Sequence, residues 1–211
     1  MPTTTPAPSQ LQLAAQQFVQ TALPRITAIT QVFSAADNPD TLGQFLEQAI
    51  TTLIQQRLGA KTLVSGVLHK TGSATDPRII ESIVHDPAKG PVSLQNGRLA
   101  IVDTKVAAGV IQIKAFASNL PKLGSRLATI HNVLYDRPAA TVMGVIVRDP
   151  DPHKTSSLRR SNHQYHAWDA AVPKWCPVYI LFAYRRGTYQ PYLPAIEAFF
   201  SNLHKNFHPQ L

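Results

Sequence analysis

Two short apolar segments carry polar side chains where a buried strand would ordinarily have none. The first, residues 79–85, contains Glu81, and the second, residues 106–116, contains Gln112 and Lys114. Side chains two residues apart share a face of a strand, so Gln112 and Lys114 should point the same way. A charged group inside a sheet costs several kcal/mol unless it is paired or bound to a ligand. We therefore expect a partner or a ligand to satisfy Glu81 and Lys114.

This arrangement resembles the core of the PD-(D/E)XK nuclease superfamily. That core has an acid on its second strand, an acid-x-Lys motif on its third strand, and helices before and after the sheet. Glu81 stands at the position of the first acid, and Gln112-Ile113-Lys114 stands at the position of the acid-x-Lys motif. Glu47, on a helix expected before the sheet, matches an acid found in many members. The resemblance covers residues 41–147, about half of the chain.

The resemblance implies a restriction-endonuclease-like fold and a metal-dependent endonuclease that hydrolyses phosphodiester bonds, with DNA as the favoured substrate. By the same resemblance, Glu81 and Gln112 would hold Mg²⁺ or Mn²⁺, and Lys114 would orient the attacking water. Glu47 would add charge beside the metal ion. A homodimer is one implied arrangement, because many nucleases of this fold pair to cut two strands.

Both acidic positions depart from the usual motif. The first is lengthened from Asp to Glu81, and the second is the neutral Gln112. An amide oxygen can bind Mg²⁺ but brings no charge, so metal binding should weaken. Gln-x-Lys variants occur in branches that resemble Mrr-type restriction enzymes, and Glu47 could supply a second carboxylate. Two alternatives stay open: a catalytically degenerate copy that binds nucleic acid or protein, and a coincidental motif in an unrelated α/β domain.

Helical spacing of apolar residues surrounds this region. It predicts helices over residues 11–32, 41–59, 123–135 and 192–207. Pro24 should kink or end the first helix. Asp40 and Thr41 should cap the second helix, where Gln44 completes a capping box with Thr41.

Short runs rich in β-branched residues alternate with these helices and are bounded by Gly, Pro, Asp or Asn. They predict strands at 62–68, 79–85, 98–102, 106–116, 141–147 and 178–184. The order predicts one globular α/β domain with a mixed central sheet flanked by helices. Within it, residues 1–38 form an N-terminal helical extension and residues 39–211 form the nuclease-like domain.

Residues 149–170 form a long polar segment, which in a compact domain is usually functional or disordered. Between residues 154 and 186 the chain carries six Lys or Arg and one acid. Since Arg matches phosphate geometry through two parallel hydrogen bonds, this region predicts contacts to nucleic acid. The expected contact residues are Lys154, Arg159, Arg160, Arg185 and Arg186. A solvated connection is the alternative.

The composition supports a folded protein with a polyanionic partner. The 211 residues are 44% apolar, and 20 Lys and Arg against 12 Asp and Glu give a net charge of +8. Such an excess favours nucleic acid as the partner, although it also serves solubility. Phosphate-cradling glycine motifs and the Gly-x-Ser-x-Gly motif are absent from the sequence, which argues against a nucleotide-binding enzyme or an α/β-hydrolase.

The single cysteine and the length of the apolar runs bear on the compartment. Cys176 stands alone, so an intrachain disulfide is impossible, and we expect a buried, unreactive thiol. The longest apolar run, residues 178–184, is far shorter than the ~18 residues of a transmembrane helix. We therefore expect no membrane partner and a cytoplasmic location.

Overall fold

The computed structural model describes residues 9–35, 38–70, 79–96, 99–116, 120–136, 140–148, 158–161, 164–167 and 176–207. The α-helices among them are α1 (Gln10–Ala35), α2 (Pro39–Gln55), α3 (Leu120–Val133) and α4 (Leu193–Phe207), and a 3₁₀ turn spans Pro87–Lys89. The strands are β1 (Thr62–His69), β2 (Ile80–His85), β3 (Leu94–Asn96), β4 (Leu99–Asp103), β5 (Ala107–Phe116), β6 (Thr141–Arg148), β7 (Leu158–Ser161), β8 (Gln164–Ala167), β9 (Val178–Arg185) and β10 (Thr188–Pro191).

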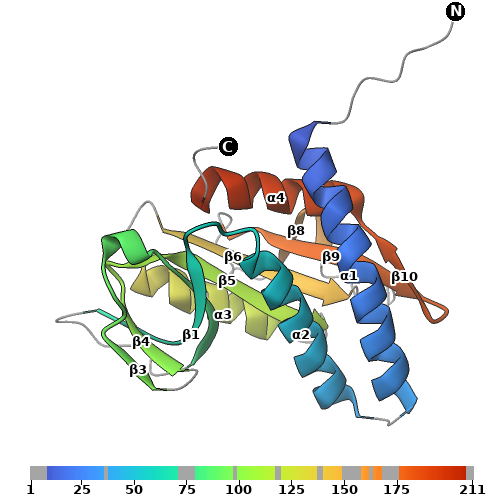
Figure 1. The fold of residues 1–211 in the computed structure, drawn as a ribbon, viewed down its shortest axis with the longest axis horizontal. Helices are drawn as coiled ribbons and strands as arrows, with labels where there is room; N and C mark the ends of the chain where they lie inside the picture. The colour runs from blue at the N-terminus through green and yellow to red at the C-terminus, as the bar shows by residue number, and fades with distance from the viewer. Residues whose placement is uncertain are drawn as a thin grey trace, which may run out of the picture.

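The described strands form one mixed sheet of ten strands (Figure 1). Its order is β3-β4-β1-β2-β5-β6-β9-β8-β7, and β10 pairs with β9 outside this path. β5, β6 and β9 run parallel to one another, and so do β1 and β4, whereas the other neighbouring strands are antiparallel. The sheet therefore has a parallel centre with antiparallel flanks.

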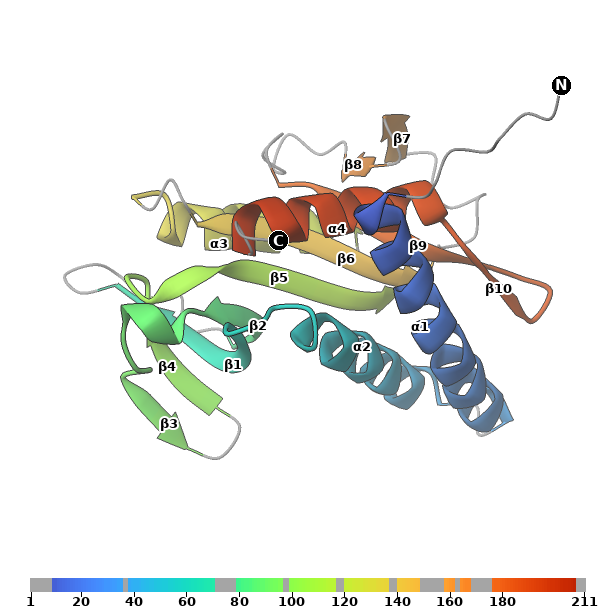
Figure 2. The ribbon, with the colours of Figure 1, turned by 45° about the horizontal axis from the view of Figure 1, so that its top comes forward.

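The helices cover both faces of this sheet (Figure 2). Side chains from α1, α2 and α4 form one buried apolar cluster with alternate residues of β5, such as Ile111 and Ile113. Side chains from α3 form a second cluster with the opposite face, which includes Val110. Burial on both sides explains why the central strands are almost continuously apolar. The α/β class and the mixed sheet flanked by helices are confirmed.

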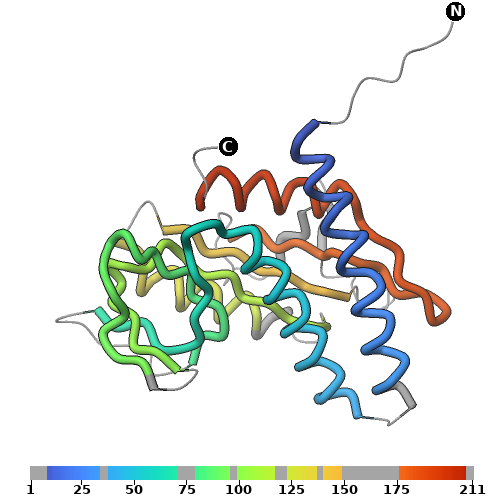
Figure 3. Tube along the Cα trace, in the orientation of Figure 1, coloured from blue at the N-terminus to red at the C-terminus, as the bar shows by residue number. Residues whose placement is uncertain are grey.

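Helix α1 packs into the same core as the sheet. Phe18 is buried, and its ring lies edge-on to that of Phe200 in α4, with centroids 5.3 Å apart. The hydroxyl groups of Thr30 and Tyr189 share a buried hydrogen bond of 2.8 Å between α1 and β10. The trace in Figure 3 shows how this first helix lies beside C-terminal segments that are distant in sequence. A domain division at residue 38 stays a prediction.

One expectation about helix ends is wrong, and a second is narrowed, since the first helix does not end at Pro24. Helix α1 continues through Pro24, because Ala22 and Ile26 on either side of it are fully buried in the core. This packing outweighs the missing backbone N–H of the proline. Helix α2 is capped by Asn38 rather than by Asp40 or Thr41: the Asn38 side chain accepts a hydrogen bond from the Thr41 N–H.

Four short strands were not predicted. β3 and β10 have only three and four residues, and β7 and β8 form a hairpin within the segment expected to be a loop. Strands this short offer too little alternation to be recognised. Arg186 and Gly187 in the turn between β9 and β10 have φ values of 50° and 81°, and a two-residue hairpin loop requires such positive values. The glycine is the sequence signal for this turn.

Candidate functional site

The site lies where β2 and β5 stop pairing. Their antiparallel register runs through Ile83 opposite Val110, and within the described residues it ends there. Continuing this register by two residues would place Glu81 opposite Gln112. β5 meanwhile keeps its parallel pairing with β6. The two strands thus separate at the point where their polar side chains occur.

Three polar side chains of β2 and β5 meet at this fork. Glu81 Oε2 accepts hydrogen bonds from Gln112 Nε2 at 3.1 Å and from Lys114 Nζ at 2.9 Å. Lys114 Nζ also lies 3.3 Å from Glu81 Oε1. The acid, the amide and the lysine that were singled out in the sequence therefore form one connected cluster.

Helix α2 brings a second carboxylate to the cluster. Glu47 Oε2 lies 3.6 Å from Lys114 Nζ, and Glu47 Oε1 accepts a 2.9 Å hydrogen bond from the Ala115 N–H of β5. Burial of this carboxyl raises its pKa above the usual range, and the nearby charge of Glu81 acts in the same direction. Lys114 and the Ala115 N–H oppose that rise, because both stabilise the ionised form.

The burial of these groups differs from the expectation of a fully buried site. The side chain of Glu81 is 49% exposed and that of Lys114 is 36% exposed, whereas Gln112 is 4% exposed. The charged groups reach solvent because the strands separate around them. The interaction of Glu81 with Lys114 is therefore partly screened by solvent, and it adds little to stability.

The cluster has a donor set that suits a hard divalent cation. With both glutamates ionised, two negative charges face one lysine, which leaves a net charge of −1. Carboxylate and amide oxygens are the ligands that Mg²⁺ and Mn²⁺ prefer. The buried Gln112 Oε1 has no hydrogen-bond partner among the described residues. Rotating the Gln112 amide by half a turn would direct this oxygen toward Glu81, so the residues fit a metal ion.

Comparison with solved structures shows extensive similarity at low sequence identity. The cAAA-bound form of NucC from P. aeruginosa ATCC27853 matches with a TM-score of 0.62 and 11% identity, covering 95% of this chain and 91% of that chain. NucC from E. coli MS115-1 matches in its cAAA-bound form with a TM-score of 0.61 and 12% identity, covering 97% and 93%. The apo form of the E. coli MS115-1 protein matches with a TM-score of 0.54 and 12% identity, covering 92% of this chain and 89% of that chain.

This chain has the restriction-endonuclease-like fold. The similarity extends over nearly the whole length of the NucC structures, so α1 and α4 lie within the shared architecture. No protein-family model matches the sequence, and no curated protein does. The NucC-like fold is therefore carried by a strongly diverged sequence.

The basic residues predicted to contact nucleic acid lie at different places. Arg185 and Arg186 lie at the end of β9, which is the same edge of the parallel strands that Lys114 approaches in β5. Arg159 and Arg160 lie on β7, the last strand of the sheet order and four strands from β5. Lys154 lies outside the described residues.

Two residues near the site were not singled out from the sequence. The Arg148 guanidinium, at the end of β6, lies 3.7 Å from the centroid of the Tyr184 ring and 5.5 Å from that of Phe116. An arginine that ends an apolar strand parallel to β5 could have drawn attention to this position. Ser82, next to Glu81, is 1% exposed, and its hydroxyl has no partner in the part of the chain that the structure describes. Its sequence context carries no such signal.

Other candidate residues are structural. Cys176 is fully buried, as expected, and burial raises the pKa of its thiol to about 11, which disfavours the reactive thiolate. Tyr189 is 4% exposed, and its hydroxyl is hydrogen-bonded to that of Thr30, so it belongs to the core. No helix among the described residues is long and apolar enough to cross a membrane.

Proposed function

We propose that this protein is a metal-dependent nuclease that hydrolyses phosphodiester bonds, with DNA as its substrate. The observation that carries the proposal is the convergence of Glu47, Glu81, Gln112 and Lys114 at the fork between β2 and β5. The restriction-endonuclease-like fold supports it, and Glu81, Gln112 and Lys114 are the residues that the PD-(D/E)XK resemblance assigns to the variant motif.

Each residue has a defined task in this proposal. Glu81 and the oxygen of Gln112 would hold Mg²⁺ or Mn²⁺, and Glu47 would contribute a further carboxylate. A bound divalent cation supplies charge stabilisation to the phosphate and lowers the pKa of bound water. Lys114 holds Glu81 in place through its hydrogen bonds, and its ammonium group can orient a water molecule and offset the charge that develops on the phosphate.

The proposed partner is a polyanion whose phosphates contact basic side chains of this chain. We assign phosphate contacts to Arg185 and Arg186 at the end of β9, and Arg159 and Arg160 on β7 are proposed to bind a more distant part of the same strand or duplex. Lys154, which lies outside the described residues, is proposed as a further phosphate contact. The net charge of +8 supports this assignment, since it favours nucleic acid over neutral substrates. A cytoplasmic location and a homodimer remain part of the proposal.

Cleavage of a mixed set of DNAs tests the proposal. Plasmid, linear duplex and single-stranded DNA are incubated with Mg²⁺ or Mn²⁺, with and without cAAA, the ligand named for two of the similar structures. The Lys114→Ala variant is the comparison, and Lys205→Ala, an exposed lysine on α4, is the matched control. Cleavage by the wild type and by Lys205→Ala alone supports the proposal. Equal cleavage by Lys114→Ala contradicts the role of Lys114.

A non-catalytic binding module is the second candidate. It is favoured by the bond that Gln112 Nε2 donates to Glu81, because the cluster satisfies much of its own hydrogen bonding without a metal ion. In that case none of the DNAs is cut under any condition, yet DNA binding weakens steeply with salt as phosphate contacts require. Binding with a shallow salt dependence would indicate a protein partner instead.

A further inference from the structure

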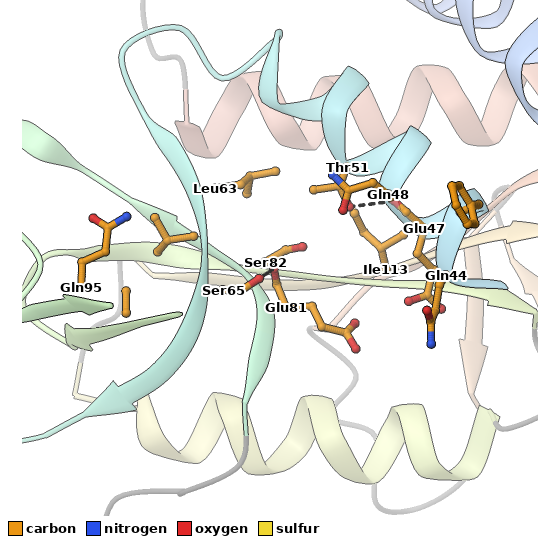
Figure 4. Close-up of a pocket in the computed structure, with 13 residues that line it drawn as sticks. Gln44, Glu47, Gln48, Thr51, Leu63, Ser65, Glu81, Ser82, Gln95 and Ile113 are labelled. Atoms are coloured by element: carbon orange, nitrogen blue, oxygen red, sulfur yellow. Dashed lines mark hydrogen bonds between the residues drawn. The ribbon is translucent and has the colours of Figure 1, made fainter. Parts of the chain in front are cut away.

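A groove of about 790 Å³ opens beside the carboxylate cluster. Helix α2 forms one wall, and β1, β2 and the β3–β4 pair form the other (Figure 4). Glu47 and Glu81 lie among its lining residues, so the groove is continuous with the proposed catalytic site. The site described above accounts for these two carboxylates but not for the rest of the groove.

The lining has the wrong charge for phosphate and suitable chemistry for a neutral polar group. Of the lining residues, only Glu47 and Glu81 are charged. The remaining polar groups are neutral amides and hydroxyls from α2, β1, β2 and β3. Gln44 and Gln48 from α2 lie across the groove from Gln95 of β3. Each amide offers both donors and an acceptor, which matches the edge of a nucleobase rather than an anion.

Two further observations point to a bound group. Ser82 lines the groove with a side chain that is 1% exposed, and no described residue hydrogen-bonds to its hydroxyl. Buried hydroxyl groups are normally hydrogen-bonded, so this one calls for a partner from the groove. Phe45 also borders the groove, and 48% of it is exposed although its ring stacks on Phe33. An exposed aromatic side chain next to amides is a common platform for bases.

We propose that this groove receives an unpaired nucleobase of the substrate strand while the adjoining phosphate lies at Lys114. The inference rests on the proposed nuclease function and names its substrate class, a strand with at least one unstacked nucleotide. Amide groups of Gln44 and Gln48 and the hydroxyl of Ser82 bind the base edge. The acidic residues at the groove mouth keep phosphates out of the groove and leave them to Lys114 and the metal ion.

Binding to three DNA probes tests this inference without any cleavage. The wild-type chain in EDTA is titrated with a fluorescein-labelled single strand, with the same strand carrying abasic positions, and with its duplex. We expect the single strand to bind about tenfold more tightly than the abasic strand, which is the scale of one stacked base. The duplex should bind more weakly than the single strand at equal salt. Abasic and intact strands that bind equally, or a duplex that binds more tightly, would overturn the inference.

Substitutions of groove residues test whether the base-dependent part of DNA binding occurs in the groove. Gln48→Ala and Ser82→Ala should bring binding of the intact strand down toward that of the abasic strand. Ser82→Ala removes a hydroxyl that has no partner in the structure, so thermal unfolding should stay unchanged or rise. Gln20→Ala, an exposed glutamine on α1 outside the groove, is the control and should keep the full preference. If both groove variants still bind the intact strand more tightly than the abasic strand, to the same degree as the wild type, the assignment of the base to this groove is overturned.

Binding and cleavage measurements together distinguish a failure of this inference from a failure of the nuclease proposal. Base-dependent binding without cleavage by the metal-loaded protein would retain the groove and remove the catalytic function. Cleavage without base-dependent binding would retain the nuclease and remove the groove.

Discussion

Glu81 and Gln112 lie two residues beyond Ile83 and Val110, the last paired residues of β2 and β5, and their side chains are joined by a 3.1 Å hydrogen bond. The bond exists because the strands separate there, so that side chains rather than backbone groups meet. Lys114 then reaches the same carboxylate from two residues further along β5. The end of the pairing between β2 and β5 thus creates an accessible polar cluster in an otherwise apolar sheet.

Lys114→Ala should abolish cleavage and leave the fold intact. The ammonium group bridges Glu47 and Glu81, and its loss removes the positive charge that would assist the attacking water. A positioned group of this kind contributes about 10²–10⁴-fold to rate. Cleavage rates and circular dichroism of Lys114→Ala and Lys205→Ala measure both effects. A variant that cuts within about threefold of wild type would assign the chemistry elsewhere.

Gln112→Glu should lower the stability of the metal-free protein and increase the stabilisation that a metal ion provides. The new carboxylate cannot donate to Glu81, and it places a third negative charge beside Lys114 in a position that is 4% exposed. We expect a loss of about 1–3 kcal/mol in the free energy of unfolding without metal. Added Mg²⁺ should raise the melting temperature more than it does for the wild type.

Thermal unfolding in EDTA and in Mg²⁺ measures these two effects. Gln112→Asn is the control, because it keeps an uncharged amide while shortening its reach. A Gln112→Glu protein that loses stability and gains nothing from Mg²⁺ or Mn²⁺ would favour the binding module over the nuclease.

The central strands were predictable because their apolar runs are long and because polar residues interrupt them in a recognisable order. The residues of the cluster could be singled out in the sequence because they interrupt these apolar runs. The register that places Glu81 opposite Gln112 was not predictable, since it depends on contacts between strands about thirty residues apart. For that reason the partial exposure of Glu81 and Lys114 was missed.

Several misses have a common physical cause. Pro24 stays inside α1 because tertiary packing on both sides outweighs local propensity. The hydroxyl of Ser82 stands out only once α2 is placed over β2, since serine in a strand has no distinctive pattern. The groove is formed by segments that are distant in sequence, so no sequence motif predicts it.

Glu47 should make the stability depend on pH in a particular direction. Burial raises the pKa of its carboxyl, so its contribution to stability is fully present below the pKa of an unfolded Glu. That contribution is lost as the pH rises through the higher folded-state pKa. In Glu47→Gln the amide oxygen can still accept from the Ala115 N–H, but it does not titrate.

The difference in free energy of unfolding between wild type and Glu47→Gln should therefore fall as the pH rises above about 4, where an unfolded Glu titrates, until Glu47 is ionised in the folded protein as well. Urea denaturation at intervals across this range measures it, and groups common to both proteins cancel in the difference. A difference that rises with pH would mean that Lys114 and Ala115 outweigh the burial of the carboxyl.

Two glycines beside the site should respond oppositely to alanine. A Cβ at Gly43 in α2 would lie 3.5 Å from Phe116, which is ordinary contact, and alanine favours the helix by about 1 kcal/mol. A Cβ at Gly109 in β5 would lie 2.1 Å from the carbonyl oxygen of Thr141, so the backbone must shift. We expect Gly43→Ala to stabilise and Gly109→Ala to destabilise by about 3 kcal/mol or more. Chemical denaturation of both variants measures this, and a stable Gly109→Ala would contradict the β5–β6 packing.

Arg186→Asn should lower the salt dependence of DNA binding while preserving the hairpin. Arg186 is exposed at the β9–β10 turn with φ of 50°, a conformation that asparagine tolerates well before Gly187. The substitution therefore removes charge with little strain. If Arg186 contacts a phosphate, the slope of log affinity against log salt should fall by about 1.

Arg25→Gln on α1 removes the same unit of charge at another exposed position and serves as the control. Because both variants have the same net charge, a change of slope in Arg186→Asn alone isolates a local contact from the general attraction of a basic protein. Equal slopes in the wild type and Arg186→Asn would place the DNA away from this turn. The phosphate path would then have to follow other basic residues.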